Sequence, residues 1–81
     1  MTVTVRLFAR ARDLAGAAVV TVDLPPGATA ADLRRRLAAD HPALAPLLEH
    51  SALAVENEFA GDDRILPPHA EIALLPPVSG G

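Results

Sequence analysis

Apolar and polar residues alternate along the first segment of the chain. Residues 2–8 read Thr-Val-Thr-Val-Arg-Leu-Phe and place three apolar side chains on one face of an extended backbone: Val3, Val5 and Leu7. A second strand is predicted over residues 18–24, where a Pro-Pro-Gly sequence ends it. The short connection holds a predicted helical turn over 11–15, which Gly16 closes. We therefore expect the two strands to pair antiparallel.

The main helix of the chain is predicted to begin at Thr29. The Thr29 hydroxyl can cap free backbone N–H groups, and Asp32 adds negative charge at the positive end of the helix dipole. Leu33 and Leu37 lie four residues apart and so share one helix face. We expect the helix to end at His41-Pro42, because proline does not continue it.

Shorter elements and one more apolar strand are predicted in the second half of the chain. Leucines recur between residues 44 and 48 at a helical spacing, and residues 53–55 predict a third strand. Phe59 is expected to anchor the segment that follows. Residues 71–75, Glu-Ile-Ala-Leu-Leu, predict a last strand that is apolar on both faces, as is typical of a central strand.

Two strands, a helix and at least two further strands are the order of a β-grasp domain, an α+β fold. Its first and last strands lie side by side and parallel at the centre of a mixed sheet, with one main helix packed across one face. At 81 residues, of which 51% are hydrophobic, the chain has the size and composition of one domain with one core. We expect that domain over residues 1–75 and an extended, flexible tail over residues 76–81.

Composition narrows the possible chemistry. The chain has no cysteine, which excludes disulfides, thiolate metal sites and a cysteine nucleophile. Its net charge of -3 and its two aromatic residues argue against nucleic-acid binding. The three histidines lack the spacing of metal ligands, so we expect no metal site. A signal-peptide pattern and an apolar run of membrane length are both absent, which predicts a cytoplasmic protein without a membrane partner.

All seven basic residues are arginine, and lysine is absent. An Arg-, Ala- and Pro-rich genome would also produce this pattern. It leaves the α-amino group as the one amine of a neighbouring copy that could attack an activated C-terminus.

The last residues carry the candidate chemistry. Gly80-Gly81 follow the lead-in Pro76-Pro77-Val78-Ser79, whose prolines favour an extended backbone that reaches roughly 20 Å over six residues. Glycine has no β-carbon, so two in succession let the backbone enter a narrow slot. This pattern favours Gly81 as the reactive residue, Gly80 as the residue that permits threading, and Ser79, Val78, Pro77 and Pro76 as positioning elements. The alternative is a terminus without a function.

The chain resembles the small, sulfur-carrying subunits of molybdopterin synthase, which are ubiquitin-like β-grasp proteins. The resemblance spans essentially the whole chain. It is carried by several segments: Leu7-Phe8-Ala9, residues 11–16, Ala31-Asp32-Leu33, Leu53-Ala54-Val55 with Glu58, and above all the ending 71–81 with its Pro-Pro-Val-Ser-Gly-Gly sequence. Two loops depart from the family pattern. Glu56 stands where asparagine is usual, and His69-Ala70 replaces a frequent Gly-Asp, which bears on partner choice.

The resemblance implies a carrier that is not an enzyme by itself. An E1-like adenylating enzyme would use ATP to place AMP on Gly81, and a sulfurtransferase would supply the sulfur that replaces it. The Gly81 thiocarboxylate would then donate sulfur to cyclic pyranopterin monophosphate in molybdenum cofactor biosynthesis. The covalent AMP and thiocarboxylate are intermediates, and no permanently bound cofactor is implied.

The resemblance also implies a partner, the large catalytic subunit of the synthase, in a heterotetramer of two small and two large subunits. By the family pattern Phe8 and Leu75 contact that partner, with Phe59 as a further candidate; each has a core position as its alternative. Leu74 and Leu75 point to opposite faces, so one should be less buried than the other. Two other functions stay open: a sulfur carrier for thiamine or tRNA thiolation, and a non-catalytic β-grasp interaction module.

Overall fold

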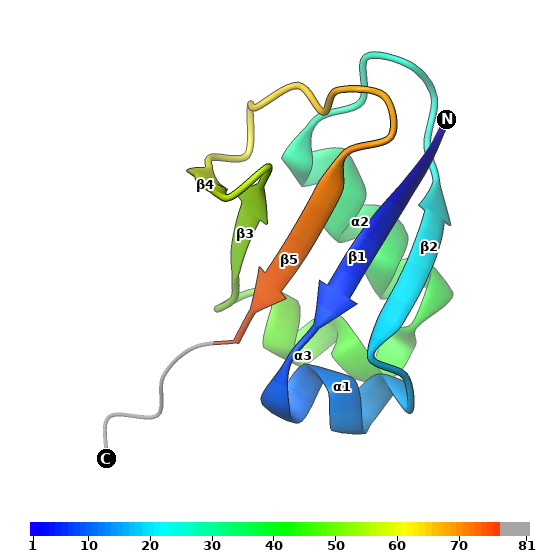
Figure 1. The fold of residues 1–81 in the computed structure, drawn as a ribbon. Coiled ribbons are helices and arrows are strands. Elements are labelled where there is room, and N and C mark those ends of the chain that lie inside the picture. The colour runs from blue at the N-terminus through cyan, green and yellow to red at the C-terminus, as the bar shows by residue number, and fades with distance from the viewer. Residues whose placement is uncertain (77–81) are drawn as a thin grey trace.

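The computed structural model describes residues 1–76, which form a mixed five-stranded sheet with helices against one of its faces (Figure 1). The order of the strands across the sheet is β2-β1-β5-β3-β4. Their bounds are β1 (Thr2–Leu7), β2 (Val19–Asp23), β3 (Ala52–Val55), β4 (Glu58–Ala60) and β5 (Glu71–Leu75). β1 pairs antiparallel with β2 and parallel with β5. The predicted α+β, ubiquitin-like β-grasp fold is thereby confirmed.

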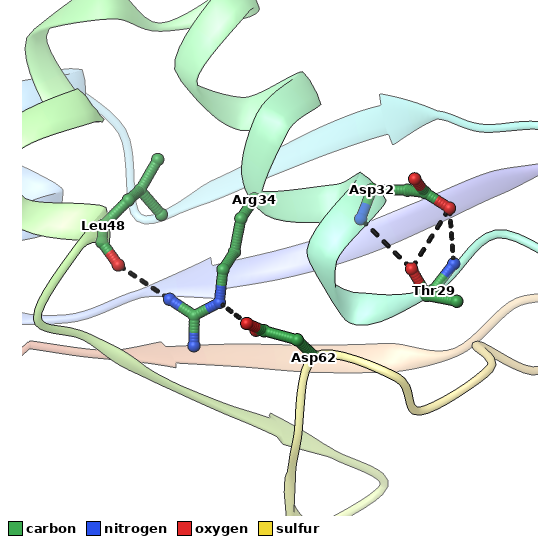
Figure 2. Close-up of polar contacts among 5 residues, drawn as sticks. All are labelled: Thr29, Asp32, Arg34, Leu48 and Asp62. Carbon is green, nitrogen blue, oxygen red and sulfur yellow. Dashed lines mark hydrogen bonds and ion pairs between the residues drawn. The ribbon is translucent and has the colours of Figure 1, made fainter.

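Four helical segments connect the strands: α1 (Ala9–Ala15), α2 (Ala30–Asp40), the 3-10 helix η1 (Pro42–Leu44) and α3 (Ala45–Leu48). α1 ends at Gly16, whose φ of 74° is the left-handed conformation that glycine adopts readily. α2 begins with a full capping box, in which the side chains of Thr29 and Asp32 each accept from the other's backbone N–H (Figure 2). The predicted boundaries of the main helix are therefore correct.

The core lies between the sheet and the helices. Val3, Val5 and Leu7 are at most 2% exposed, as the alternation in the first strand predicts. Leu33 and Leu37 of α2 are fully buried against the sheet. Leu74 is buried and Leu75 is half-buried, which confirms that the two leucines face opposite sides of β5.

β4 is not among the strands predicted from the sequence. It pairs antiparallel with β3 across a two-residue connection in which Glu56 and Asn57 have φ values of 50° and 67°. Positive φ at both central residues is typical of a type I′ hairpin turn, which is usually Asn-Gly or Asp-Gly. Glu-Asn is an uncommon pair in that turn, so the hairpin has no clear signature in the sequence.

Pro76 follows β5 directly and is half-buried. The remaining predicted tail residues, Pro77, Val78, Ser79, Gly80 and Gly81, lie outside the described part of the chain. Within residues 1–76, no helix has the length and apolar character needed to cross a membrane.

Candidate functional site

One face of the sheet is not covered by helices in Figure 1, and we call it the open face. Strand pairing places one residue from each strand in a row across it: Val19, Arg6, Ala73, Ala54 and Phe59. The centre of the row consists of two alanines, flanked by larger side chains. Small side chains on central strands leave the middle of the open face low and its edges high.

A hollow with a volume of about 360 Å³ lies over these alanines. Phe8 forms its apolar wall, and four polar residues complete its rim: Arg6, Glu56, Asn57 and Glu71. A small apolar floor with a few polar groups at the edge is a surface suited to receiving a side chain of another protein.

The polar rim is held by contacts that are exposed to solvent. Arg6 Nε lies 3.6 Å from Glu71 Oε1, and both side chains are more than half exposed. The Glu71 N–H donates to Glu56 Oε1 at 3.1 Å, and the Glu56 N–H donates to the Glu71 carbonyl at 3.1 Å. An ion pair this exposed contributes about 0–1 kcal/mol, so a partner can rearrange it at little cost.

All three predicted partner-contact residues lie on the open face. Phe8 is 44% exposed and lines the hollow, and Leu75 is half-buried opposite Ala52. Phe59 is 78% exposed, so the expectation that it anchors the segment after β3 is wrong. Its partner in the register is Ala54, which faces away from the helices, and the ring therefore projects toward solvent.

The open face adjoins the point where the chain leaves the sheet. Leu7 and Leu74 are partners in the parallel β1–β5 ladder, so Phe8 and Leu75 follow them side by side. The chain leaves the sheet at the end of β5 (Figure 1), where Pro76 follows Leu75. Two of the three predicted contact residues thus lie at the base of the predicted tail. The tail residues 77–81 that carry the predicted chemistry are outside the described part.

Asp32 has a pKa below its ordinary value of 3.8, first because the Thr29 backbone N–H donates to its carboxylate, with smaller contributions from the Thr29 hydroxyl and Arg35. This carboxylate caps α2 and lies away from the open face, so its role is structural. Residues 1–76 contain no group of three or more His, Asp or Glu side chains placed to hold a metal ion.

Three consecutive arginines, Arg34, Arg35 and Arg36, lie in the middle of α2. Arg35 and Arg36 are exposed, with side chains 73% and 52% accessible. The Arg34 side chain is only 23% accessible and donates to the Leu48 carbonyl and to Asp62 (Figure 2). The Leu48 carbonyl that accepts from Arg34 belongs to α3, a short helix that the leucine spacing over residues 44–48 predicts.

The profile of the ThiS family matches residues 5–81. The molybdopterin synthase sulfur carrier subunit of Arabidopsis thaliana is 35% identical over 79 residues, which cover 98% of this chain and 82% of that protein. The protein of the same name from Chlamydomonas reinhardtii is 35% identical over 83 residues, with complete coverage of both chains. The crystal structure of the Haloferax volcanii small archaeal modifier protein 1 matches with a TM-score of 0.86 and 30% identity, over 95% of this chain and 98% of that one.

Proposed function

The chain belongs to the ThiS family, and from that membership we propose that it is the sulfur carrier subunit of a molybdopterin synthase. The observation that carries the proposal is similarity, over nearly the whole chain, to relatives with that name. The Pro-Pro-Val-Ser-Gly-Gly ending after a central strand supports it. The role is that of a protein co-substrate in the synthesis of the molybdenum cofactor.

The reactive group in this role is the main-chain carboxylate of Gly81. A terminal carboxyl has a pKa of about 3.5, so at neutral pH it is ionised and a poor electrophile. An adenylating enzyme transfers AMP from ATP to this carboxylate and releases pyrophosphate. The outer sulfur of a donor persulfide then attacks the carbonyl carbon, forms a C–S bond and breaks the C–O bond to AMP. A second thiol attacks the donor's sulfur in the resulting acyl disulfide, forms a disulfide with the donor and releases the thiocarboxylate. The resulting thiocarboxylate carries sulfur on a chain that has no cysteine.

The folded body holds and aims that terminus. β5 has neighbours on both sides, so Leu74 is held by the β1 and β3 ladders, and Leu75, which precedes Pro76, is paired with Ala52 of β3. The conformational cost of ordering a tail in an active site is about 1–2 kcal/mol per residue, and prolines lower it. Pro76 and Pro77 therefore stiffen the base of the tail, and Gly80 lets its tip pass a narrow channel.

The open face supplies the docking surface for the large subunit. Phe8 and Leu75 lie at the base of the tail, and Phe59 stands exposed on the edge strand β4. Buried aromatic side chains account for much of the affinity in typical interfaces. Two small and two large subunits form the assembly, and the large subunit contributes the acids, bases and phosphate-binding groups of the reaction.

Two other functions remain as alternatives. One is a sulfur carrier for thiamine or tRNA thiolation, and the second is a β-grasp module whose terminus is not activated. The acceptor that takes the sulfur separates the first alternative from the proposal. Activation of Gly81 separates the second from both carrier functions.

Intact-mass measurement tests the proposal directly. The chain is incubated with ATP, an E1-like adenylating enzyme and a persulfide sulfur donor, and then with a large subunit and cyclic pyranopterin monophosphate. We expect a mass gain equal to the exchange of one oxygen for one sulfur, and its loss when molybdopterin forms. An unchanged mass would favour the interaction module. A thiolated chain that does not support molybdopterin synthesis would favour a carrier of another pathway.

A further inference from the structure

The amino group at Met1 is part of the β1–β2 ladder. The Met1 ammonium donates to the Leu24 carbonyl at 2.6 Å, and the Leu24 N–H donates back to the Met1 carbonyl at 2.8 Å. This reciprocal pair extends the ladder by one residue beyond Thr2 and Asp23. Met1 is half-buried and packs against the core. To act as a nucleophile, the amino group must first break its hydrogen bond to the Leu24 carbonyl, and Met1 must leave its packed position against the core.

The side chains offer no other amine. All basic residues are arginine, whose guanidinium group stays protonated and is not a nucleophile at neutral pH. Hydroxyl groups need an adjacent base to react. Those of Thr2 and Ser51 instead donate to Asp23 Oδ1 and the Leu47 carbonyl, both at 2.7 Å, and Ser51 is only 6% exposed.

The two ends of the described chain also lie apart. β1 and β5 are parallel neighbours, so Met1 stands where β5 begins and Pro76 stands where β5 ends (Figure 1). Reaction of a terminus with its own amino group would require the tail to run back along the full length of β1. The six tail residues reach roughly 20 Å, about the length of the six-residue β1, so closure into a ring would need the whole tail to be fully extended.

We propose that this chain is an acyl donor that does not acylate its own copies. The proposal deepens the proposed function, since it concerns the fate of the activated Gly81. In self-acylation an amine nitrogen would attack the Gly81 carbonyl carbon, form a C–N bond, expel AMP and lose its proton to water. The absence of lysine and the pairing of the Met1 ammonium withhold that nitrogen. The acyl-adenylate is therefore kept for an external sulfur nucleophile, with water as its competitor.

A Gly81 thioester prepared by intein cleavage tests this without an adenylating enzyme. The thioester of the 81-residue chain is incubated at mildly alkaline pH, and covalent dimers are counted against hydrolysed monomer by mass spectrometry. Two variants restore an amine: Arg35→Lys on the exposed face of α2, and a Gly-Ser-Gly extension before Met1 that moves the amino group out of the ladder. We expect each to form roughly tenfold more dimer than the unmodified chain, since free amines attack thioesters. An acetylated extension is the matched control and should return dimer to the unmodified level.

Dimer formation by the unmodified chain at the level of the extended variant would overturn the proposal, above all if peptide mapping finds a Gly81–Met1 amide. The failure of the proposed function has a different signature. It would appear as no pyrophosphate release from ATP with the adenylating enzyme, whatever the thioester does. Dimer formation and pyrophosphate release are measured on separate samples, so the further inference and the proposed function can each fail independently.

Discussion

The Arg34 guanidinium donates from Nη1 to the backbone carbonyl of Leu48 at 2.7 Å (Figure 2). That carbonyl belongs to the last residue of α3, where intrahelical donors run out. Arg34 Nε also donates to Asp62 Oδ1 at 3.1 Å. One side chain of α2 therefore ties together α3 and the turn after β4, which are distant in sequence.

Arg34→Ala should destabilise the fold without affecting sulfur transfer. It removes a charged hydrogen bond to a partly buried carbonyl, which is typically a loss of about 2 kcal/mol. Urea unfolding measures the change. Arg36→Ala is the matched control, because it removes only the exposed pair with Asp40 and should cost less than about 0.5 kcal/mol. Equal effects of the two substitutions would show that the Leu48 contact contributes nothing.

Asp32→Asn should make stability less dependent on pH. The folded-state pKa of Asp32 is lowered, so its carboxylate stabilises the fold above pH 3.8 and loses that effect as the pH falls through the lowered value. The difference in unfolding free energy between wild type and variant should be constant near neutrality and shrink in acid. Thr29→Ala should keep most of the pH dependence, because the largest cause is the Thr29 backbone N–H. A difference that does not vary with pH would contradict the assignment.

Much of the fold could be predicted because local signals agreed with the tertiary structure. The alternation at Val3, Val5 and Leu7 and the Thr29 cap each specify an element and its buried face. β4 was missed because its stability comes from pairing with β3, and Glu56-Asn57 lacks the usual residues of its turn. The three residues of β4 are too few to show a period.

The candidate site also has features that the sequence predicts and features that only the structure reveals. The roles of Gly80 and Gly81 could be proposed from the sequence because their chemistry is that of the main chain, and these roles stay predictions. The hollow could not, because Ala54 and Ala73 lie far apart in sequence and become neighbours only through the β3–β5 register. Phe59 stays a predicted contact residue, and its expected role as an anchor is wrong because pairing with Ala54 turns its ring toward solvent.

Phe59→Ser should weaken binding of the large subunit while leaving the fold unchanged. The ring is 78% exposed, so the substitution removes little buried area and should change stability by less than about 0.5 kcal/mol. An aromatic contact at an interface is typically worth more than about 1 kcal/mol, so affinity should fall by roughly tenfold. Titration calorimetry with the large subunit measures this affinity. Ile65→Ser is the control: Ile65 is 63% exposed but pairs with Thr29 outside the open face. Equal affinities for the two variants would exclude Phe59 from the interface.

Gly80→Val should leave folding intact and block the transfer of sulfur. Residues 1–75 contain the sheet and every buried core residue named above, so the unfolding midpoint should match that of wild type. A β-branched side chain widens the chain one residue before the reactive carboxylate and restricts its backbone, so the terminus should no longer reach an active site through a narrow channel. Thiocarboxylate formation and molybdopterin synthesis, followed by intact mass and product analysis, should both fall by at least about tenfold, as expected when the reacting group is held out of place. Gly80→Ala, which adds a single methyl group, should retain more activity than Gly80→Val. If valine supports wild-type transfer, the slot does not select for glycine, and the Gly-Gly ending is not what admits this chain to its partners.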